Sequence, residues 1–326
     1  MHNEEEFIER TLQAINSQEY EGEWEVLFVN DRSTDKCPEI VQNFCENSSA
    51  ENRQKIRLLN VPVNSPKIAS PKKRALNTGF LEAKNEILLI ADADCEPPKN
   101  WLKSMALHFA DADVVQGAKA NNGDDSFLHS YQKLETLGFT LIESAGYNRN
   151  KPLVASAASL AYRKKLFFNC GGFENLYDLT SGDDDMLIHR MAKISGTRFA
   201  YNWDTSAIMP TAPVNSWLAL LQQRARWGSN GANYENKFYS AFLFCIYVFF
   251  VWLLVSPFLI FAGLPVWYFT LPFAVKFICD FLLLFSGAKK LKSLSLLWCF
   301  PFVEVIQIPL FSLAVPMGSL GLYRWK

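Results

Sequence analysis

Charged side chains almost disappear from the chain after residue 240, and this feature constrains the fold most. Of three apolar stretches there, the first contains no charged residue, the second one lysine and one aspartate, and the third one glutamate. About 20 apolar residues span a bilayer core, and a buried helical core would need a soluble shell that this part does not encode. We therefore predict a membrane region over 240–322 with two to three transmembrane segments, at about 241–263, 264–286 and 294–320.

Residues 1–235 mix charged and apolar side chains and predict a separate domain outside the membrane. The chain of 326 residues carries a formal net charge of -1, so its charge does not favour nucleic acid as a partner. None of the seven cysteines forms a C-x-x-C pair, and the four histidines are scattered. This pattern is typical of reduced thiols and argues against a zinc site.

Apolar strands alternate with helical patterns through this domain. Strands are expected at 24–31, 56–61, 86–94, 113–119 and 155–162. Helices are expected at 4–17, 35–47, 72–84, 101–110, 127–147 and 184–195. Such alternation predicts an α/β fold, a mostly parallel sheet flanked by helices. A further helix at about 214–231 has apolar residues on one side and arginines on the other, which suits a membrane surface.

Three D-x-D triplets occur, and their places along the expected strands distinguish them. Asp92 and Asp94 end the apolar run "ILLIADAD" and so follow a strand, where open α/β sheets bind ligands. Asp111 and Asp113 precede a strand, at the wrong end, and are typical of a solvated turn. Asp31 also ends a strand, so we expect it at the same edge of the sheet as Asp92.

The carboxylates expected at this edge of the sheet predict a site for a metal ion and a diphosphate. Carboxylate oxygens suit Mg²⁺ or Mn²⁺, which also bind phosphate oxygens. Lys72 and Lys73, near the start of a helix, favour a phosphate, although a solvated first turn is equally compatible with them.

The third triplet lies in "GDDDML", residues 182–187, where three carboxylates are adjacent. Their repulsion should raise at least one pKa, and such a carboxylate could act as a general base. Taken alone, the pattern is better explained by an acidic helix N-terminus.

Six short motifs follow one another along the domain: "HNEEE", "VNDRSTD", "KKRALNTGF", "DAD", "GDDDML" and "QQRARW". In this order they resemble the motifs of the inverting family-2 glycosyltransferases with a GT-A fold, the Rossmann-like fold of nucleotide-diphospho-sugar transferases. Each is weak alone, whereas six in the family's order are specific. The last motif, with the apolar tail, is most similar to the membrane-bound branch that carries Q-x-x-R-W.

The resemblance implies a role for each matching residue. Asp31 would contact the nucleotide base and Lys72 the diphosphate. Asp92 and Asp94 would be the D-x-D pair that binds donor and metal, with Asp94 on Mg²⁺ or Mn²⁺. Asp184 falls on the aspartate of the family's G-E-D motif and would be the catalytic base.

The Q-x-x-R-W motif falls on Gln223, Arg226 and Trp227, which would border the donor pyrophosphate and the acceptor entrance. The expected activity is hexosyl or N-acetylhexosaminyl transfer from a nucleotide-diphosphate sugar, expected to be a UDP-sugar. The acceptor would be a hydroxyl group of a lipid or polysaccharide. Trp227 could stack on that acceptor or simply pack.

The sequence departs from the family's pattern in four places. Asn30 replaces the first aspartate of V-D-D, Arg32 replaces its glycine, and Pro71 replaces the glycine before the lysine. The family's first strand normally precedes "NEE", so domain 1–235 is expected to be N-terminally truncated. An inactive membrane scaffold or pseudoenzyme fragment is therefore the alternative function. A nucleotidyltransferase is a further alternative, but it does not explain "QQRARW".

The expected location is the inner cell membrane, as a multi-pass protein. Nucleotide sugars are cytosolic, so the catalytic domain should face the cytosol, and the lysines of "GAKKLKS" at 287–293 fit this orientation. The third segment contains prolines and could instead follow a re-entrant path.

Polar residues inside the apolar segments mark a second expected feature. Lys276 and Asp280 are four residues apart and should pair. Glu304 and Gln307 could line an acceptor path or bond to another helix.

Overall fold

The computed structural model describes residues 1–47, 55–62, 70–176, 179 and 181–324. Thr180 of the acidic cluster, and Trp325 and Lys326 at the end of the third apolar segment, lie outside the described residues. The chain divides into two compact units. The first comprises Met1–Ala120 with Ile142–Ala212, and the second comprises Asn121–Leu141 with Pro213–Lys326.

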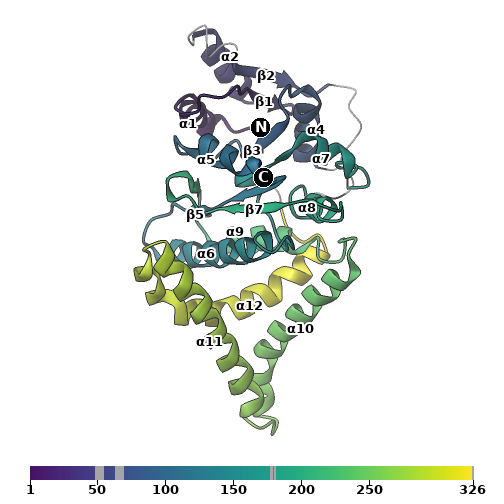
Figure 1. Ribbon diagram of the computed structural model, residues 1–326. Coiled ribbons are helices and arrows are strands. Elements are labelled where there is room, and N and C mark those ends of the chain that lie inside the picture. Colours follow the sequence, from purple (N-terminus) through teal and green to yellow (C-terminus); the bar gives the residue numbers. More distant parts are fainter. Residues whose placement is uncertain (48–54, 63–69, 177–178, 180, 325–326) are drawn as a thin grey trace. The chain divides into compact units, whose positions relative to one another are not determined.

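The first unit confirms the α/β fold (Figure 1). Strands β1 (Val26–Asn30) and β2 (Ile56–Asn60) pair in parallel. A four-stranded sheet has the order β3-β6-β4-β7. Its strands are β3 (Ile87–Ile90), β4 (Val114–Gly117), β6 (Leu160–Arg163) and β7 (Phe199–Asn202). Two short strands, β5 (Lys119–Asn121) and β8 (Met209–Thr211), form a separate pair.

The sheet is mixed, which corrects the expectation of a mostly parallel one. Strand β6 runs antiparallel to both neighbours, with Leu160 opposite Ile90 of β3 and Gln116 of β4. The chain therefore enters β6 at the edge where β3 and β4 end, without first crossing back over the sheet. The strand expected at 155–162 starts only at Leu160, because residues Ala157–Ser159 form a 3-10 turn.

Except for α7, the helices of the first unit lie where the sequence patterns predict them. They are α1 (Glu5–Asn16), α2 (Cys37–Asn47), α4 (Pro71–Glu82), α5 (Trp101–Leu107), α7 (Lys164–Asn169) and α8 (Asp185–Met191). Buried side chains of α1 and α2, such as Leu12 and Val41, share one apolar core with Phe28 of β1. Met105 of α5 and Val115 of β4 belong to a second apolar core.

The N-terminal residue lies beside β1. The Met1 ammonium donates to the Val29 carbonyl at 2.7 Å, and the amide of Asp31 donates to the Met1 carbonyl at 3.0 Å. These two bonds fix the backbone at the carboxyl end of β1, the position from which Asp31 extends.

The second unit contains helices α9 (Trp217–Gly228), α10 (Lys237–Ile260), α11 (Trp267–Lys290) and α12 (Phe300–Ser319) (Figure 1). Among the described residues of this unit, three helical segments are long and apolar enough to cross a membrane: Lys237–Ile260, Trp267–Lys290 and Leu294–Ser319. The last begins with a 3-10 turn, Leu294–Cys299, and contains Pro309 and Pro316 within α12. Length and composition therefore support the membrane association expected from the sequence.

Helix α9, expected from its sequence pattern, packs closely against α12. A Cβ atom on Gly318 would lie only 2.1 Å from the carbonyl oxygen of Ala225, so this crossing requires glycine. Leu220 on the apolar side of α9 is fully buried, in one core with Phe300 and Val303 of α12. The apolar side of α9 is thus at least partly covered by protein.

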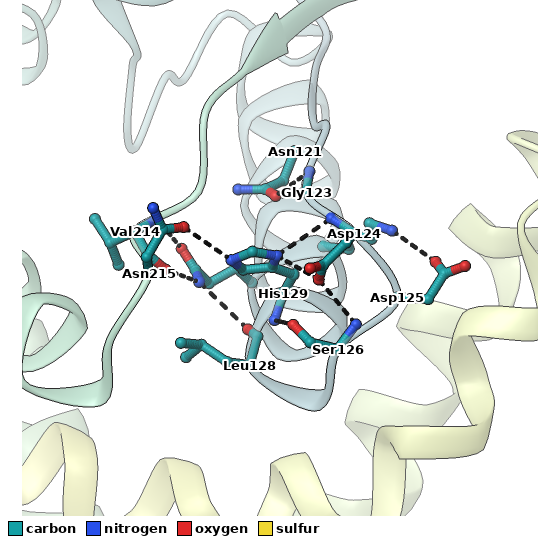
Figure 2. Close-up of polar contacts among 11 residues, drawn as sticks. Asn121, Gly123, Asp124, Asp125, Ser126, Leu128, His129, Val214 and Asn215 are labelled. Atoms are coloured by element: carbon teal, nitrogen blue, oxygen red, sulfur yellow. Dashed lines mark hydrogen bonds and ion pairs between the residues drawn. The ribbon is translucent and has the colours of Figure 1, made fainter.

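Helix α6 (Phe127–Tyr147) contributes residues to both units, and a polar network caps its start (Figure 2). The hydroxyl of Ser126 accepts the amide of His129, as an N-cap residue does. The His129 ring contacts the Asp124 carboxylate at 2.6 Å through Nδ1, and Asn215 Oδ1 at 3.2 Å through Nε2. Asp124 also accepts the Ser126 amide at 2.9 Å. The network joins the helix start to the segment that leads into α9.

The apolar helices of the second unit enclose a lysine-centred polar cluster. Lys276 Nζ donates to Asp280 at 2.8 Å, which confirms the expected pair. It also donates to Glu304 at 2.5 Å and to Gln307 at 3.0 Å, both on α12. Lys276 and Glu304 are buried. Of the two alternatives left open for Glu304 and Gln307, bonding to another helix is the one found.

Candidate active site

The candidate site lies beside the carboxyl ends of β1 and β3. These strands belong to separate sheets, not to the one sheet expected, and helix α4 reaches both ends through Arg74 and Lys72. Asp31 directly follows β1, and Asp92 follows β3 after one residue. Because β6 runs antiparallel, the turn that precedes it also reaches the end of β3. This turn binds the acidic residues that begin α8: the amide of Ala157 donates to Asp184 at 3.2 Å.

Asp31 is buried and held by an arginine. Its side chain is 2% exposed, and Arg74 of α4 donates to both of its oxygens at 2.7 to 3.0 Å. A bidentate pair of this kind fixes the plane of the carboxylate. The sequence did not identify Arg74, although its position in "KKRALN" is one turn inside a helix that begins beside the lysines.

Asn30 and Arg32, which flank Asp31, differ from the residues of the family's V-D-D-G pattern, and both lie in a tight turn. Asn30 uses both ends of its amide, donating to Asn60 Oδ1 at 2.8 Å and accepting the Ser33 amide at 3.0 Å. Arg32 has a φ of 59°, in the left-handed region that favours glycine. The family's glycine at this position is therefore explained by backbone geometry.

Lys72 connects two of the acidic motifs. Its Nζ lies 2.6 Å from Asp92 Oδ1 and 3.3 Å from Asp183 Oδ2. Burial alone would lower the pKa of Lys72, but the charges of Asp183 and Asp92 outweigh it and raise that pKa well above the usual value. Lys72 is therefore a permanent cation between the D-x-D pair and the "GDDD" cluster.

Lys73 is separated from Lys72 by the geometry of α4. Ser70 caps this helix, with its hydroxyl accepting the Lys73 amide at 3.4 Å, and Pro71 occupies the first turn, where its missing N–H is not needed. Lys72 extends toward Asp92, whereas Lys73 is fully buried. Lys73 is thus unavailable to a phosphate, and the two lysines do not act as one cationic patch.

Asp92 and Asp94 could hold a divalent cation. Carboxylate oxygens of Asp92 and Asp94 and the sulfur of Cys95 lie within 4.8 Å of one another. Burial strongly raises the pKa of the Cys95 thiol, so this thiol stays protonated and is a poor ligand. The remaining donors are two hard oxygens, which fit Mg²⁺ or Mn²⁺.

Asp184 is held as an N-cap residue of α8. One of its oxygens accepts the Asp185 amide at 2.8 Å and the other the Ala157 amide. Burial, and then the charge of Asp183, raise the pKa of Asp184 to about 6. Asp185 accepts the Ala155 amide at 2.5 Å, and burial raises its pKa also. The raised pKa expected for this cluster is therefore found at Asp184 and Asp185, and two backbone amides fix the orientation of the Asp184 carboxylate.

Asp113 lies in the turn before β4, as predicted, but its side chain is paired with two arginines and is not simply solvated. It pairs with Arg163 at 3.0 Å and with Arg198 at 3.5 Å. It also accepts the backbone amide of Arg198. These contacts join β4, β6 and the start of β7.

The remaining candidates, Gln223, Arg226 and Trp227, lie on α9 in the second unit. Trp227 is 44% exposed. The guanidinium of Arg224 lies 4.1 Å from the centre of the Trp227 ring, and it donates to Gln223 Oε1 at 2.5 Å. Arg224 is in turn paired with Glu135 of α6. The sequence analysis missed Arg224 and Glu135, although Arg224 lies inside the motif.

Family models match most of the chain. The model described as "Glycosyl transferase family 2" matches residues 1–169, and the one described as "Glycosyl transferase family group 2" matches residues 87–313. Together they match residues 1–313.

Two curated proteins illustrate the similarity. "Probable glycosyltransferase YdaM" of Bacillus subtilis is 25% identical over 248 residues, which are 74% of this chain and 56% of YdaM. "Glycosyltransferase AglE" of Haloferax volcanii is 27% identical over 242 residues, 70% of this chain and 69% of AglE. The chain thus spans little more than half the length of the first of these relatives.

Among solved structures, S. aureus TarS residues 1–349 in complex with UDP-GlcNAc matches with a TM-score of 0.47 and 15% identity. This match covers 100% of the chain and 91% of that structure.

Proposed function

Because the chain belongs to glycosyl transferase family 2 and is a glycosyltransferase, we propose that it transfers a sugar with inversion from a nucleotide-diphosphate sugar to an acceptor hydroxyl. One observation carries this proposal: Lys72 lies between Asp92 and Asp183, next to the amide-held carboxylate of Asp184. A cation for the diphosphate and a carboxylate with a raised pKa are thereby adjacent.

In the proposed reaction, the acceptor oxygen attacks the anomeric carbon from the face opposite the diphosphate. Asp184 takes the proton of the acceptor hydroxyl as the new carbon–oxygen bond forms. The bond from the anomeric carbon to the diphosphate oxygen breaks, and its electron pair leaves with the nucleoside diphosphate. The transition state has oxocarbenium character, as in glycoside hydrolysis.

Negative charge would develop on the leaving diphosphate, and Lys72 is proposed to stabilise it. Stabilisation of developing charge by fixed groups is usually a large catalytic contribution. Asp94 and Asp92 would hold Mg²⁺ or Mn²⁺, which supplies further positive charge at the diphosphate. Asp92 would then exchange its contact with Lys72 for the metal, and Lys72 would turn to phosphate oxygens. Asp31, with its plane fixed by Arg74, would contact the nucleotide base.

Gln223, Arg226 and Trp227 are proposed to border the donor pyrophosphate and the acceptor entrance. The exposed ring of Trp227 supports an apolar or sugar-stacking contact with the acceptor. A lipid acceptor is also supported by relatives named beta-monoglucosyldiacylglycerol synthase and dolichyl-phosphate beta-glucosyltransferase. We propose a UDP-sugar donor, and a multi-pass location in the cell membrane with residues 1–235 on the cytosolic side.

The stereochemistry of the product tests the inverting mechanism. An α-linked nucleotide sugar should give a β-linked product, which the anomeric coupling constant in the proton NMR spectrum of the isolated product distinguishes. An α-linked product would contradict direct displacement with Asp184 as base.

A further inference from the structure

The described residues between α7 and α8 precede the acidic cluster, and several of them have unusual backbone angles. Gly171, Gly172, Asn175 and Gly182 all have positive φ. A backbone without a regular ladder needs other partners for its buried carbonyl groups. The positions of Asp183 and Asp184 therefore depend on what fixes this segment.

Lys73 binds three of these carbonyls. Its Nζ donates to the carbonyl oxygens of Leu176 at 2.9 Å, Leu179 at 2.7 Å and Ser181 at 2.7 Å. An ammonium group has three N–H donors, and each has an acceptor here. The Lys73 side chain is fully buried.

Arg190 binds the earlier part of the same segment. Its Nη1 donates to the carbonyls of Gly172 at 3.0 Å and Glu174 at 2.6 Å. Arg190 comes from α8 and Lys73 from α4, so two cations from two helices hold one stretch of backbone. Lys73 holds the part nearest to the acidic residues.

We propose that Lys73 is a positioning residue: its ammonium fixes the carbonyl groups of Leu176, Leu179 and Ser181 and thereby places Asp183 and Asp184 for the reaction. This inference rests on the proposed function for its catalytic consequence only. Burial costs a lysine free energy, and it lowers the pKa of Lys73 to about 8 despite the nearby charges of Asp183 and Asp184. A side chain needed only to fill this space would be apolar, whereas the three carbonyls require a cationic donor.

The test compares Lys73→Met with wild type and with Lys164→Met. Methionine keeps the length of the side chain and removes its donors. Lys164 is a suitable control because it donates to one backbone carbonyl, that of Ala83, at 2.6 Å, away from the acidic segment. Hydrogen exchange of peptides covering 172–184 is measured on the full chain, together with kcat and the donor KM.

In Lys73→Met, exchange in residues 172–184 should rise at least about tenfold while peptides from β3 and β4 stay protected. The kcat should fall about 10- to 100-fold, because displacement of a catalytic group by about 1 Å has an effect of this size, with donor KM changed less than about threefold. Lys164→Met should show neither effect. If Lys73→Met does not fold, Lys73→Gln, with a two-donor amide, should show the same pattern to a smaller degree.

Unchanged exchange in residues 172–184 would overturn the proposal, as would faster exchange with unchanged kcat. The exchange measurement does not require activity. If wild type shows no sugar transfer but exchange in residues 172–184 still rises in Lys73→Met, the positioning role of Lys73 holds and the proposed function fails.

Discussion

Arg74 holds Asp31 through both carboxylate oxygens, in a pair that is almost completely removed from solvent. Removal of one partner of such a pair leaves the other charge buried and costs about 3–5 kcal/mol. We predict that Arg74→Ala loses about this much unfolding free energy in urea titrations. The double variant Arg74→Ala/Asp31→Asn should regain part of the loss. Equal stability of the single and double variants would contradict the buried pair.

The same pair predicts a specific effect on donor binding. If Asp31 contacts the nucleotide base, Arg74→Lys, which keeps the charge but loses the planar fork, should weaken binding of UDP by about tenfold. Isothermal titration of the purified chain measures this. Unaltered affinity for UDP in both Arg74→Lys and Asp31→Asn would exclude Asp31 from the nucleotide site.

The raised pKa of Asp184 predicts an acidic limb in the activity profile. A general base acts when deprotonated, so kcat should rise with pH through about 6 and level off above it. Asp183→Asn removes the neighbouring charge that helps to raise this pKa, and should therefore shift the limb to lower pH. A limb that keeps its position in Asp183→Asn would contradict the assigned cause of the shift.

Sugar transfer should depend on a divalent metal ion that Asp94 helps to bind. We predict that chelation abolishes transfer, that Mn²⁺ or Mg²⁺ restores it, and that Asp94→Asn raises the metal concentration for half-maximal activity by about tenfold or more. Asp111→Asn is the matched control, because Asp111 is an exposed member of another D-x-D triplet. Activity that survives chelation would rule out the metal.

The cluster around Lys276 should stabilise the apolar helices of the second unit. Lys276→Met leaves Glu304 buried without its cation, and should lower the thermal midpoint of the detergent-solubilised protein. Adding Glu304→Gln should restore most of the loss, since a neutral amide can bond to Gln307. A thermal midpoint that Lys276→Met leaves unchanged would contradict the cluster.

Much of the fold could be predicted from local patterns. Periodicity gave α6 its observed bounds, and the loss of charge located α10, α11 and α12. The direction of β6 could not be predicted, because strand polarity depends on the path of the whole connection from β4. Short strands such as β7 carry too few residues for a clear alternation.

The candidate site was predicted less completely. The carboxylates follow apolar strands, so their position at the carboxyl ends of strands follows from the rule for α/β sheets. Their partners are distant in sequence: Arg74 is 43 residues from Asp31, and Lys73 is 108 residues from Ser181. Two adjacent lysines in a first turn look alike in sequence, and only the packing of α4 leaves Lys72 half-buried beside Asp92 and buries Lys73 among backbone carbonyls.

The most direct test of the account is sugar transfer from a panel of nucleotide sugars by membranes that contain the chain, with wild type, Asp184→Asn and Asp111→Asn compared. The account predicts Mn²⁺- or Mg²⁺-dependent transfer from one donor class by wild type and Asp111→Asn. Asp184→Asn should lose at least about 10²-fold in kcat, a typical contribution of a general base, while its affinity for UDP stays within about threefold. Transfer by Asp184→Asn at the wild-type rate would contradict the central claim.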